Sequence, residues 1–289
     1  MISKLSNAHV RKVSHLISDA PIGTLTPTSG RMARDEAGRV YHITSAVARE
    51  KQKRTAQMAR DKRHFSFSHM QHIQEITRNL SNKMCGYILL LQPYIAFKTN
   101  VLVSEGRDQT PLTVDDLAQV WNVSRRTART VIDELEARSI VFCVGGSITV
   151  NERYHFRKKV GKGEVDALIK TYATTLKKFR LSAADLGFVY KMLSNVHYET
   201  NLICADPFAS PEYIRFLSDK EIGQLVGMSE TKTKEVLARL RRAGIIGEWI
   251  NAEDKREKFT ALNPFVFYRK QGEPDGLLLA LFANKRMDS

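Results

Sequence analysis

The sequence predicts a mainly α-helical fold with small β elements, an α+β fold in which one helical unit occurs twice along the chain. Three observations support this prediction: an internal repeat, apolar residues at helical spacing within each copy, and a short strand–turn–strand pattern near the end of each copy. With 289 residues the chain is long enough for two domains of ordinary size, each with its own core.

The repeat consists of four matching segments that follow one another in the same order. The first pair is Leu80-Ser-Asn-Lys-Met-Cys-Gly-Tyr-Ile and Leu181-Ser-Ala-Ala-Asp-Leu-Gly-Phe-Val. The other three pairs begin at Phe97 and Tyr198, at Thr113 and Ser218, and at Asn151 and Asn263. Four matches in one order are improbable by chance, so the chain is predicted to contain a duplicated domain.

In the first copy, two short helices follow each other closely. Thr113 is expected to cap the first helix, with Asp115 and Asp116 suited to its positive N-terminal end. Asn122 suits a tight turn, after which Ser124 is expected to cap the second helix. The residues expected to face the core are Leu117, Ala118 and Trp121 in the first helix, and Ala128, Val131, Ile132 and Leu135 in the second.

The other side chains near the start of the second helix are polar or basic. They are Ser124, Arg125, Arg126, Thr127, Arg129 and Thr130. Side chains at the N-terminal end of a recognition helix meet base edges in the major groove of DNA, and arginine can contact guanine with two hydrogen bonds. This set is therefore predicted to bind DNA.

The second copy repeats the plan with different chemistry. Ser218 and Ser229 are the expected caps, and Ile222, Gly223, Leu225, Val226, Val236, Leu237 and Leu240 are expected to pack inside. The predicted reading residues are Ser229, Glu230, Thr231, Lys232 and Lys234. Because the two reading surfaces differ, the sequence predicts an asymmetric DNA site.

A hairpin is expected after each helix pair. Residues 140–144 and 147–150 flank Gly145-Gly146, and residues 245–250 and 259–262 flank a longer loop. Contacts with the phosphate backbone are predicted for Ser147 in the first hairpin and for Lys255, Arg256 and Lys258 in the second.

These residues resemble known families. The pattern Leu117-Ala, Val123-Ser124-Arg-Arg-Thr127-Ala and Leu135-Glu-Ala-Arg-Ser-Ile140 is similar to the signature of MarR-type regulators. The segment Leu262-Asn263-Pro264-Phe-Val-Phe-Tyr-Arg269 resembles the ending of RepL-type plasmid and phage replication proteins. The resemblance implies two tandem winged helix-turn-helix domains, although such families generally carry one module per chain.

The complete predicted organisation has five parts. They are a basic, partly disordered N-terminal arm with a helix (1–64), the first domain (65–160), a linker helix (161–180), the second domain (181–272) and an apolar C-terminal helix (273–289). In the arm, phosphate contacts are predicted for Arg49, Lys51, Lys53 and Arg54. The C-terminal helix is expected to pack on the second domain or, alternatively, to form a dimer contact.

Charge points to a polyanionic partner. The chain has 45 Lys and Arg residues against 31 Asp and Glu, a net charge of +14 and a pI near 9.7. Cations near phosphates release condensed counterions, which favours binding to nucleic acid. Cys85, Cys143 and Cys204 lack metal-binding or disulfide spacing and are expected to be small core residues of a cytoplasmic protein. No apolar run is long enough to span a membrane, and no export signal is recognisable.

The sequence therefore predicts a transcription regulator, encoded by a phage, plasmid or prophage, that binds an operator in double-stranded DNA. A replication initiator that binds origin repeats is the alternative. No catalytic motif, cofactor site or metal site is recognised, so an enzyme is not expected. RNA polymerase or replication proteins are possible partners, and both a monomer acting as a pseudo-dimer and a homodimer remain open.

Overall fold

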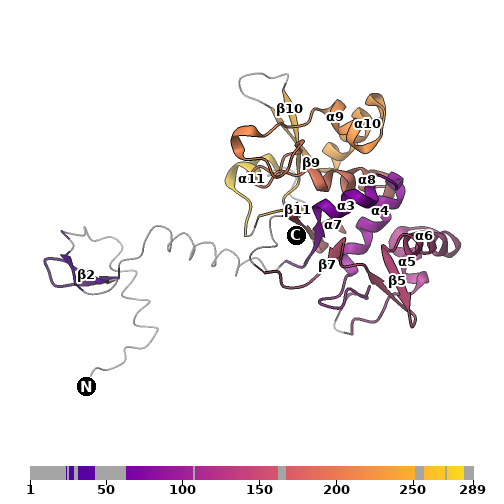
Figure 1. Ribbon diagram of the computed structural model, residues 1–289, viewed down its shortest axis with the longest axis horizontal. Helices are drawn as coiled ribbons and strands as arrows, with labels where there is room; N and C mark the ends of the chain where they lie inside the picture. Colours follow the sequence, from indigo (N-terminus) through magenta and orange to yellow (C-terminus); the bar gives the residue numbers. More distant parts are fainter. Residues whose placement is uncertain are drawn as a thin grey trace. The chain divides into compact units, whose positions relative to one another are not determined.

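The computed structural model describes residues 24, 26–28, 32–42, 63–106, 108–161, 167–250, 257–270 and 272–282 (Figure 1). The chain divides into two compact units, Met1–Ala59 and Arg60–Ser289. The predicted phosphate contacts Arg49, Lys51, Lys53 and Arg54 lie outside the described residues, as do Lys255 and Arg256.

The N-terminal unit contains a small antiparallel sheet. Its strands are β1 (Thr26–Pro27), β2 (Met32–Arg34) and β3 (Val40–His42), in the order β1-β2-β3. The Asp35 carboxylate accepts hydrogen bonds from the Arg39 backbone N–H at 2.8 Å and from the Tyr41 hydroxyl at 2.9 Å, which fixes the turn between β2 and β3. The sequence predicts a partly disordered arm here. That prediction missed the sheet because its strands are very short and lack apolar alternation.

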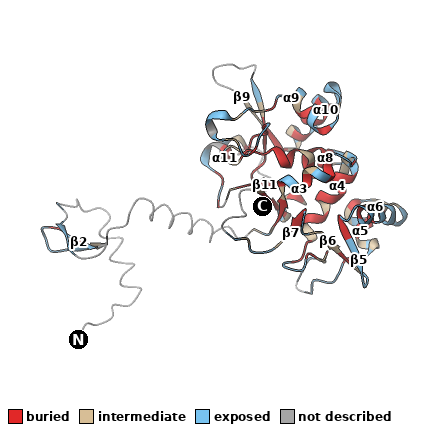
Figure 2. Ribbon diagram, viewed as in Figure 1, coloured by how far each residue is buried: buried red, intermediate tan, exposed pale blue. Residues whose placement is uncertain are grey.

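Two helices form the centre of the larger unit. They are α4 (Asn82–Leu91) and α8 (Ala183–Met192), which occupy equivalent positions in the two repeats. Ser81 and Ser182 cap them in the same way, each accepting a hydrogen bond from the backbone N–H three residues later. The two helices pack closely against each other, and Figure 2 shows both as largely buried. The repeats therefore share one core.

A four-stranded antiparallel sheet joins the repeats a second time. Its strands are β4 (Phe65–His69), β7 (His155–Phe156), β8 (Leu168–Tyr172) and β11 (Phe267–Tyr268), in the order β11-β8-β4-β7. The first repeat supplies β4 and β7, the second supplies β8 and β11, and β4 pairs with β8 so that Phe67 lies opposite Lys170. The sheet is thus arranged about an approximate two-fold axis between β4 and β8.

The remaining elements surround this centre (Figure 1). Those of the first repeat are α3 (Met70–Thr77), η1 (Gln92–Tyr94), α5 (Val114–Trp121), α6 (Arg125–Ala137), β5 (Val141–Val144) and β6 (Ser147–Val150). Those of the second are α7 (Ala173–Leu176), η3 (Leu193–Asn195), η4 (Pro211–Tyr213), α9 (Asp219–Val226), α10 (Glu230–Ala243), β9 (Ile246–Ile250), β10 (Lys258–Leu262) and α11 (Gly276–Phe282).

Equivalent asparagines make the same hydrogen bonds in both repeats. The side-chain amide of Asn100 donates to the carbonyls of Val150 and His155, at 3.2 and 2.8 Å. In the second repeat Asn201 donates to the carbonyls of Leu262 and Phe267, at 2.8 and 3.1 Å. A second pair behaves likewise, since Asn151 donates to the Ser139 carbonyl and Asn263 to the Gly244 carbonyl. These contacts attach the last segment of each repeat, which begins at Asn151 or at Asn263, to the rest of the same repeat.

The prediction of a mainly α fold with small β wings is wrong. The described residues form nine α-helices and eleven strands, and the strands belong to four sheets, so the fold is mixed α/β. The predicted linker helix at 161–180 is also wrong, because residues 168–172 form β8 and, among the described residues of this segment, the α-helix spans only Ala173–Leu176. Every residue of β8 is buried, so the strand shows no alternation of apolar and polar side chains, and its apolar residues fit helical spacing equally well.

The C-terminal helix is present as α11 and packs on the second repeat. Leu278 and Phe282 are buried together with Leu202, Ala261 and Tyr268. Of the two alternatives for this helix, packing on its own chain is the one observed. The predicted boundaries at 65–160 and 181–272 stay predictions, because both segments lie within the single unit Arg60–Ser289.

Candidate nucleic-acid interface

The first candidate reading surface is the N-terminal end of α6, and local hydrogen bonds fix its position. Thr113 caps α5 by accepting from the backbone N–H of Asp116 at 3.3 Å, while the Asp116 carboxylate accepts from that of Thr113 at 2.7 Å. Asn122 ends α5 with a φ of 52°, so the chain turns directly into the next helix. Ser124 then caps α6 by accepting from the N–H of Thr127 at 3.2 Å. The predicted caps Thr113 and Ser124 are confirmed.

The basic residues of α6 project from the surface as predicted. Ala128, Val131, Ile132 and Leu135 form its buried face. Arg125, Arg126, Arg129 and Thr130 are exposed, and Thr127 is half-buried with its hydroxyl 3.0 Å from that of Ser124. Arg125 lies 3.2 Å from the Asp115 carboxylate, in a pair that is largely exposed. Within the described part of the chain, no ion pair engages Arg126 or Arg129, so both are available to phosphates or base edges.

The second helix pair has the same capping arrangement, with an ion pair added to it. Ser218 accepts from the N–H of Glu221, and the Glu221 carboxylate accepts from the N–H of Ser218 at 2.9 Å. Arg215 forms an ion pair with the same carboxylate. The hydrogen bond from the Ser218 backbone, followed by the one from Arg215, lowers the pKa of Glu221 to about 2. The turn after α9 is made by Gly227 with a φ of 72°.

The reading end of α10 carries less free charge than that of α6. All of its predicted reading residues are exposed: Ser229, Glu230, Thr231, Lys232 and Lys234. Glu230 and Lys234 form an ion pair of 2.7 Å, which leaves Lys232 without an ion-pair partner among the described residues. Ser229 occupies the predicted N-cap position but makes no capping hydrogen bond through its side chain. The turn is fixed instead by the Thr233 hydroxyl, which donates a hydrogen bond of 2.8 Å to the Ser229 carbonyl.

The two hairpins offer less unpaired positive charge to a phosphate backbone than the sequence predicts. Ser147 is half-buried in β6, and residues 140–151 include no charged side chain. In the second hairpin Lys258 lies 2.9 Å from Glu248, which also pairs with Arg241 at 3.3 Å. The positive charge of Lys258 is therefore already neutralised by Glu248 within the hairpin. Sequence alone could not show this, because the pairing depends on the register that places Thr260 opposite Glu248. Leu225, predicted to pack inside, is 39% exposed.

The two helix pairs are attached differently to the centre of the molecule. Arg239 of α10 donates to the Asp185 carboxylate of α8 at 2.7 Å. The equivalent residues of the first repeat are Glu134 and Met84, which cannot form such a pair. Arg241 adds a bond of 2.8 Å to Asp219 at the start of α9. The second pair is therefore held by ion pairs, whereas in the first pair the Trp121 indole N–H of α5 donates to the Tyr87 carbonyl of α4 at 3.1 Å.

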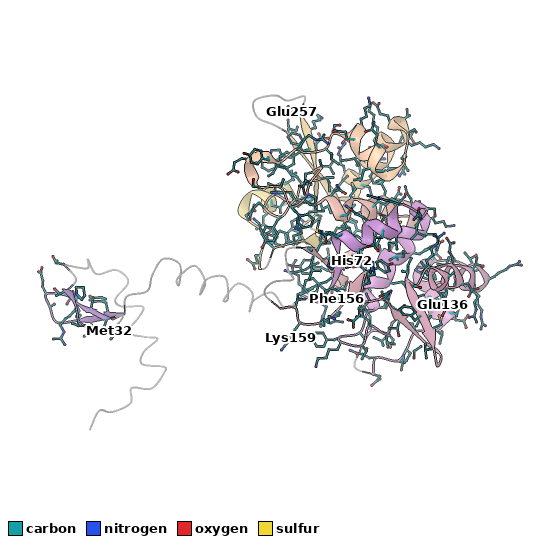
Figure 3. All side chains as sticks on the ribbon, in the orientation of Figure 1. Met32, His72, Glu136, Phe156, Lys159 and Glu257 are labelled. Carbon is teal, nitrogen blue, oxygen red and sulfur yellow. The ribbon has the colours of Figure 1, made fainter. Side chains whose placement is uncertain are left out.

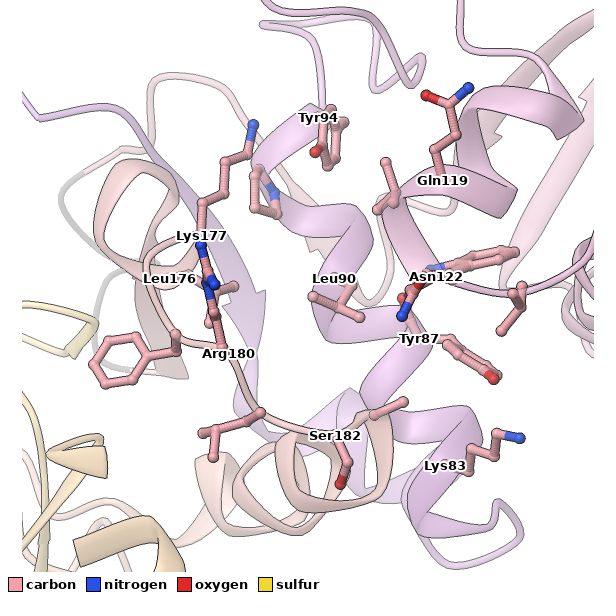
Figure 4. A pocket seen from close by; sticks show the side chains of 17 residues that line it. Lys83, Tyr87, Leu90, Tyr94, Gln119, Asn122, Leu176, Lys177, Arg180 and Ser182 are labelled. Atoms are coloured by element: carbon pink, nitrogen blue, oxygen red, sulfur yellow. The ribbon is translucent and has the colours of Figure 1, made fainter. Parts of the chain in front are cut away.

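A cleft of about 790 Å³ lies beside the first helix pair (Figure 4). Three segments far apart in the sequence line it: α4 with η1, the end of α5, and residues 176–183. Lys83, Lys177 and Arg180 are among its lining residues, and none of those residues is acidic. Lys177 lies 3.9 Å from the centre of the Tyr94 ring and pairs with Glu105. The electrostatics of the cleft suit an anion, and no local sequence pattern predicts it, because its lining comes from three separate segments.

The described residues contain no group of three or more His, Cys, Asp or Glu side chains that could hold a metal ion. All three cysteines are free; Cys85 and Cys204 are buried, and burial raises the pKa of each thiol to about 12. Cys143 is exposed, so its prediction as a core residue is wrong. No helix within the described ranges is long and apolar enough to cross a bilayer.

Comparison with known proteins adds no family. No protein-family model matches the sequence, and no curated protein matches it. Among solved structures, the chain aligns with the DIP2311 protein from Corynebacterium diphtheriae at 10% identity and a TM-score of 0.16. This alignment covers 52% of the present chain and only 23% of the other, and its score is too low to support an argument about fold. The resemblance to MarR-type and RepL-type proteins stays a prediction.

Proposed function

We propose that this chain is a sequence-specific double-stranded DNA-binding transcription regulator, with α6 as its main reading helix. The observation that supports this most strongly is the basic N-terminal end of α6. Arg125, Arg126 and Arg129 are all exposed there, and the opposite face of the helix is anchored in the core. An exposed helix end with several guanidinium groups has the chemistry needed to read guanine in the major groove.

In the proposed mechanism the two helix pairs have different roles in DNA binding. Arg126 and Arg129 contact base edges or phosphates directly, since neither has an ion-pair partner among the described residues. At α10, Glu230 has to exchange Lys234 for a new partner, such as the amino group of a cytosine. The first repeat therefore supplies most of the affinity, and the second adds discrimination.

The approximate two-fold arrangement gives a single chain the geometry of a dimer. Dimeric regulators bind half-sites about one helical turn, roughly 10 base pairs, apart. Here α6 and α10 lie on opposite sides of the α4–α8 pair (Figure 1). Because their exposed residues differ, the operator should contain two unlike half-sites. A monomer that acts as a pseudo-dimer is thus the proposed binding species.

The regulator is preferred over the replication initiator for a structural reason. The features that suggested the initiator were the tandem arrangement and the segment beginning at Leu262-Asn263-Pro264, and only the second is specific to one family. Asn263 donates to the Gly244 carbonyl at 2.8 Å and accepts from the Phe265 N–H at 2.9 Å, so its role is explained by the fold. The proposal places the protein in the cytoplasm, where free cysteines are stable, with RNA polymerase as its second partner.

The test is capture and sequencing of source-genome fragments bound by the full chain at about 150 mM salt, where non-specific binding is weak. Single sites that overlap promoters are expected. Arg126→Ala and Arg129→Ala should each weaken binding to such a site by about 1–3 kcal/mol. The matched control is Arg138→Ala, at the other end of the same helix, where the guanidinium pairs with Glu134 at 3.4 Å.

Two results would count against the proposal. If the Arg126 and Arg129 variants bind like the Arg138 variant, then α6 is not the reading helix. If the captured fragments form clusters of direct repeats beside AT-rich DNA, the protein is an initiator and not a promoter regulator.

A further inference from the structure

One face of the hairpin is covered in the second repeat and open in the first. In the second repeat α11 lies on the β9–β10 hairpin, where Leu278 and Phe282 are buried against Leu202 and Ala261. Gly247 allows this approach, because a Cβ added to it would lie 2.8 Å from the ring of Phe282. The helix is thus fitted closely to the hairpin.

The equivalent face of the first repeat consists of Val101, Phe142, Val144 and Thr149. The correspondence rests on repeated bridges, since Val101 pairs with Thr149 at the position where Leu202 pairs with Ala261 in the other repeat. Phe142 and Val144 then correspond to Gly247 and Trp249. Phe142 is 42% exposed and Val144 is 74% exposed. The element that follows the first hairpin and β7 in the described chain is β8, which enters the central sheet and does not cover this face.

This face points away from the helix that is proposed to read DNA. Cys143, between the two apolar residues, has its backbone N–H bonded to the Glu136 carboxylate of α6 at 2.9 Å, and Figure 3 shows Glu136 beside this hairpin. Successive side chains of a strand point to opposite faces, so Phe142 and Val144 project away from the Cys143 side chain. The bond to Glu136 also occupies an N–H on the free edge of β5, which hinders the addition of a further strand there.

We propose that the face formed by Val101, Phe142, Val144 and Thr149 docks a short apolar helix of a partner protein. The chemistry of the occupant follows from α11, which presents Leu278 and Phe282 four residues apart with no charge between them. The absence of charged residues from 140–151 matches such a helix better than it matches phosphate. Phe142 fills space that Gly247 leaves open, so the partner carries a smaller side chain where α11 has Phe282. This inference is independent of the proposed DNA binding.

The experiment uses the full chain and two fluorescent peptides. One peptide has the α11 sequence, residues 274–285, and the other has the same sequence with Phe282→Ala. Fluorescence anisotropy should show saturable binding of both, with the Phe282→Ala peptide tighter. Val144→Asp should weaken binding of both by about tenfold or more, because it places a carboxylate in an apolar contact. Tyr213→Asp, at a side chain that is 80% exposed on η4, should leave binding unchanged.

Other outcomes would overturn the proposal. These are no saturable binding of either peptide, or binding that Val144→Asp does not weaken. If sedimentation shows that the chain alone dimerises and that Val144→Asp abolishes the dimer, a second copy is the occupant. If Val144→Asp changes affinity for DNA but not for the peptides, the occupant is nucleic acid. Phe142→Ser provides a second variant should Val144→Asp lose its native circular dichroism spectrum.

Discussion

Gly86 of α4 and Gly187 of α8 are equivalent residues, and each lies against the backbone of the other helix. A Cβ added to Gly86 would lie 1.7 Å from the carbonyl oxygen of Ala183, and one added to Gly187 would lie 1.6 Å from that of Asn82. Asn82 and Ala183 are themselves equivalent in the repeat. The crossing is therefore symmetric in its contacts, as in a dimer with a two-fold axis, although it lies within one chain.

Alanine at either glycine should destabilise the fold. The obstructing atoms are backbone carbonyls inside helices, which cannot move without separating α4 from α8. Each of Gly86→Ala and Gly187→Ala should lower the free energy of unfolding by about 1–3 kcal/mol or more, as measured by urea denaturation. Gly161→Ala is the control, because a Cβ there meets no atom within 4 Å. Equal stabilities for all three variants would contradict the close crossing.

The features that the sequence predicted correctly are those with local signals. Thr113, Ser124 and Ser218 were recognisable as caps because a hydroxyl at that position satisfies a nearby backbone N–H. The hairpin at Gly145-Gly146 was recognisable because both residues need positive φ, and they have φ values of 56° and 79°. The exposed arginines of α6 followed from the spacing of its buried face.

The features that were missed depend on distant partners. The β7 and β11 strands contain two residues each and are held only by pairing with β4 and β8, so they have no periodicity of their own. The compensation of Lys258 by Glu248 requires the hairpin register, and the basic cleft requires three remote segments to meet. Such contacts are set by tertiary packing, which a linear pattern does not contain.

A buried polar contact also joins the repeats, between His155 of β7 and Tyr190 of α8. The His155 Nε2 atom lies 2.8 Å from the Tyr190 hydroxyl, and its Nδ1 atom lies 2.9 Å from the Ser68 hydroxyl. The equivalent residues of the other repeat are Phe267 and Leu89, both buried and apolar. The contact therefore distinguishes the two halves of an otherwise similar interface.

Substitution of one partner should cost more than substitution of both. His155→Phe alone leaves the Tyr190 hydroxyl buried without its partner, and Tyr190→Leu alone does the same to the imidazole, at about 1–3 kcal/mol each. The double variant recreates the apolar pair of the other repeat. Its loss of unfolding free energy should be clearly smaller than the sum of the single losses, as a double-mutant cycle would show. Simple additivity would mean that the two side chains are not coupled.

His155 should also make stability depend on pH. Burial lowers the pKa of His155 to about 3, well below the value near 6.5 of an unfolded chain. Below pH 6.5 the unfolded chain therefore binds a proton that the folded chain does not, and stability is lost as the pH falls from 6.5 towards 3. The slope from this residue approaches about 1.4 kcal/mol per pH unit. The measurement is urea denaturation across this range, compared with the His155→Phe/Tyr190→Leu variant, which should lack this contribution. Identical pH profiles would exclude His155 as a source.

The two candidate reading helices should respond unequally to loss of charge. Arg126→Ala and Arg129→Ala each remove a cation without an ion-pair partner among the described residues, and each should reduce the salt dependence of DNA affinity by about one unit of slope. Lys234→Ala should have a smaller effect, since Lys234 is already paired with Glu230 at 2.7 Å. Binding isotherms at several salt concentrations would measure both. Equal slopes for the three variants would contradict the asymmetry.

The strongest test of that asymmetry is a substitution that should improve binding. Glu230→Gln removes the carboxylate that holds Lys234, so the ammonium group becomes free to contact phosphate. The pair lowers the pKa of Glu230 and raises that of Lys234, so both groups are charged at neutral pH and their charges cancel in the native protein. The variant should bind non-specific DNA more tightly and with a steeper salt dependence, by about one unit of slope. At its specific site it should discriminate less, because Glu230 is the proposed acceptor for a cytosine amino group. Unchanged non-specific affinity would show that α10 does not approach the DNA backbone.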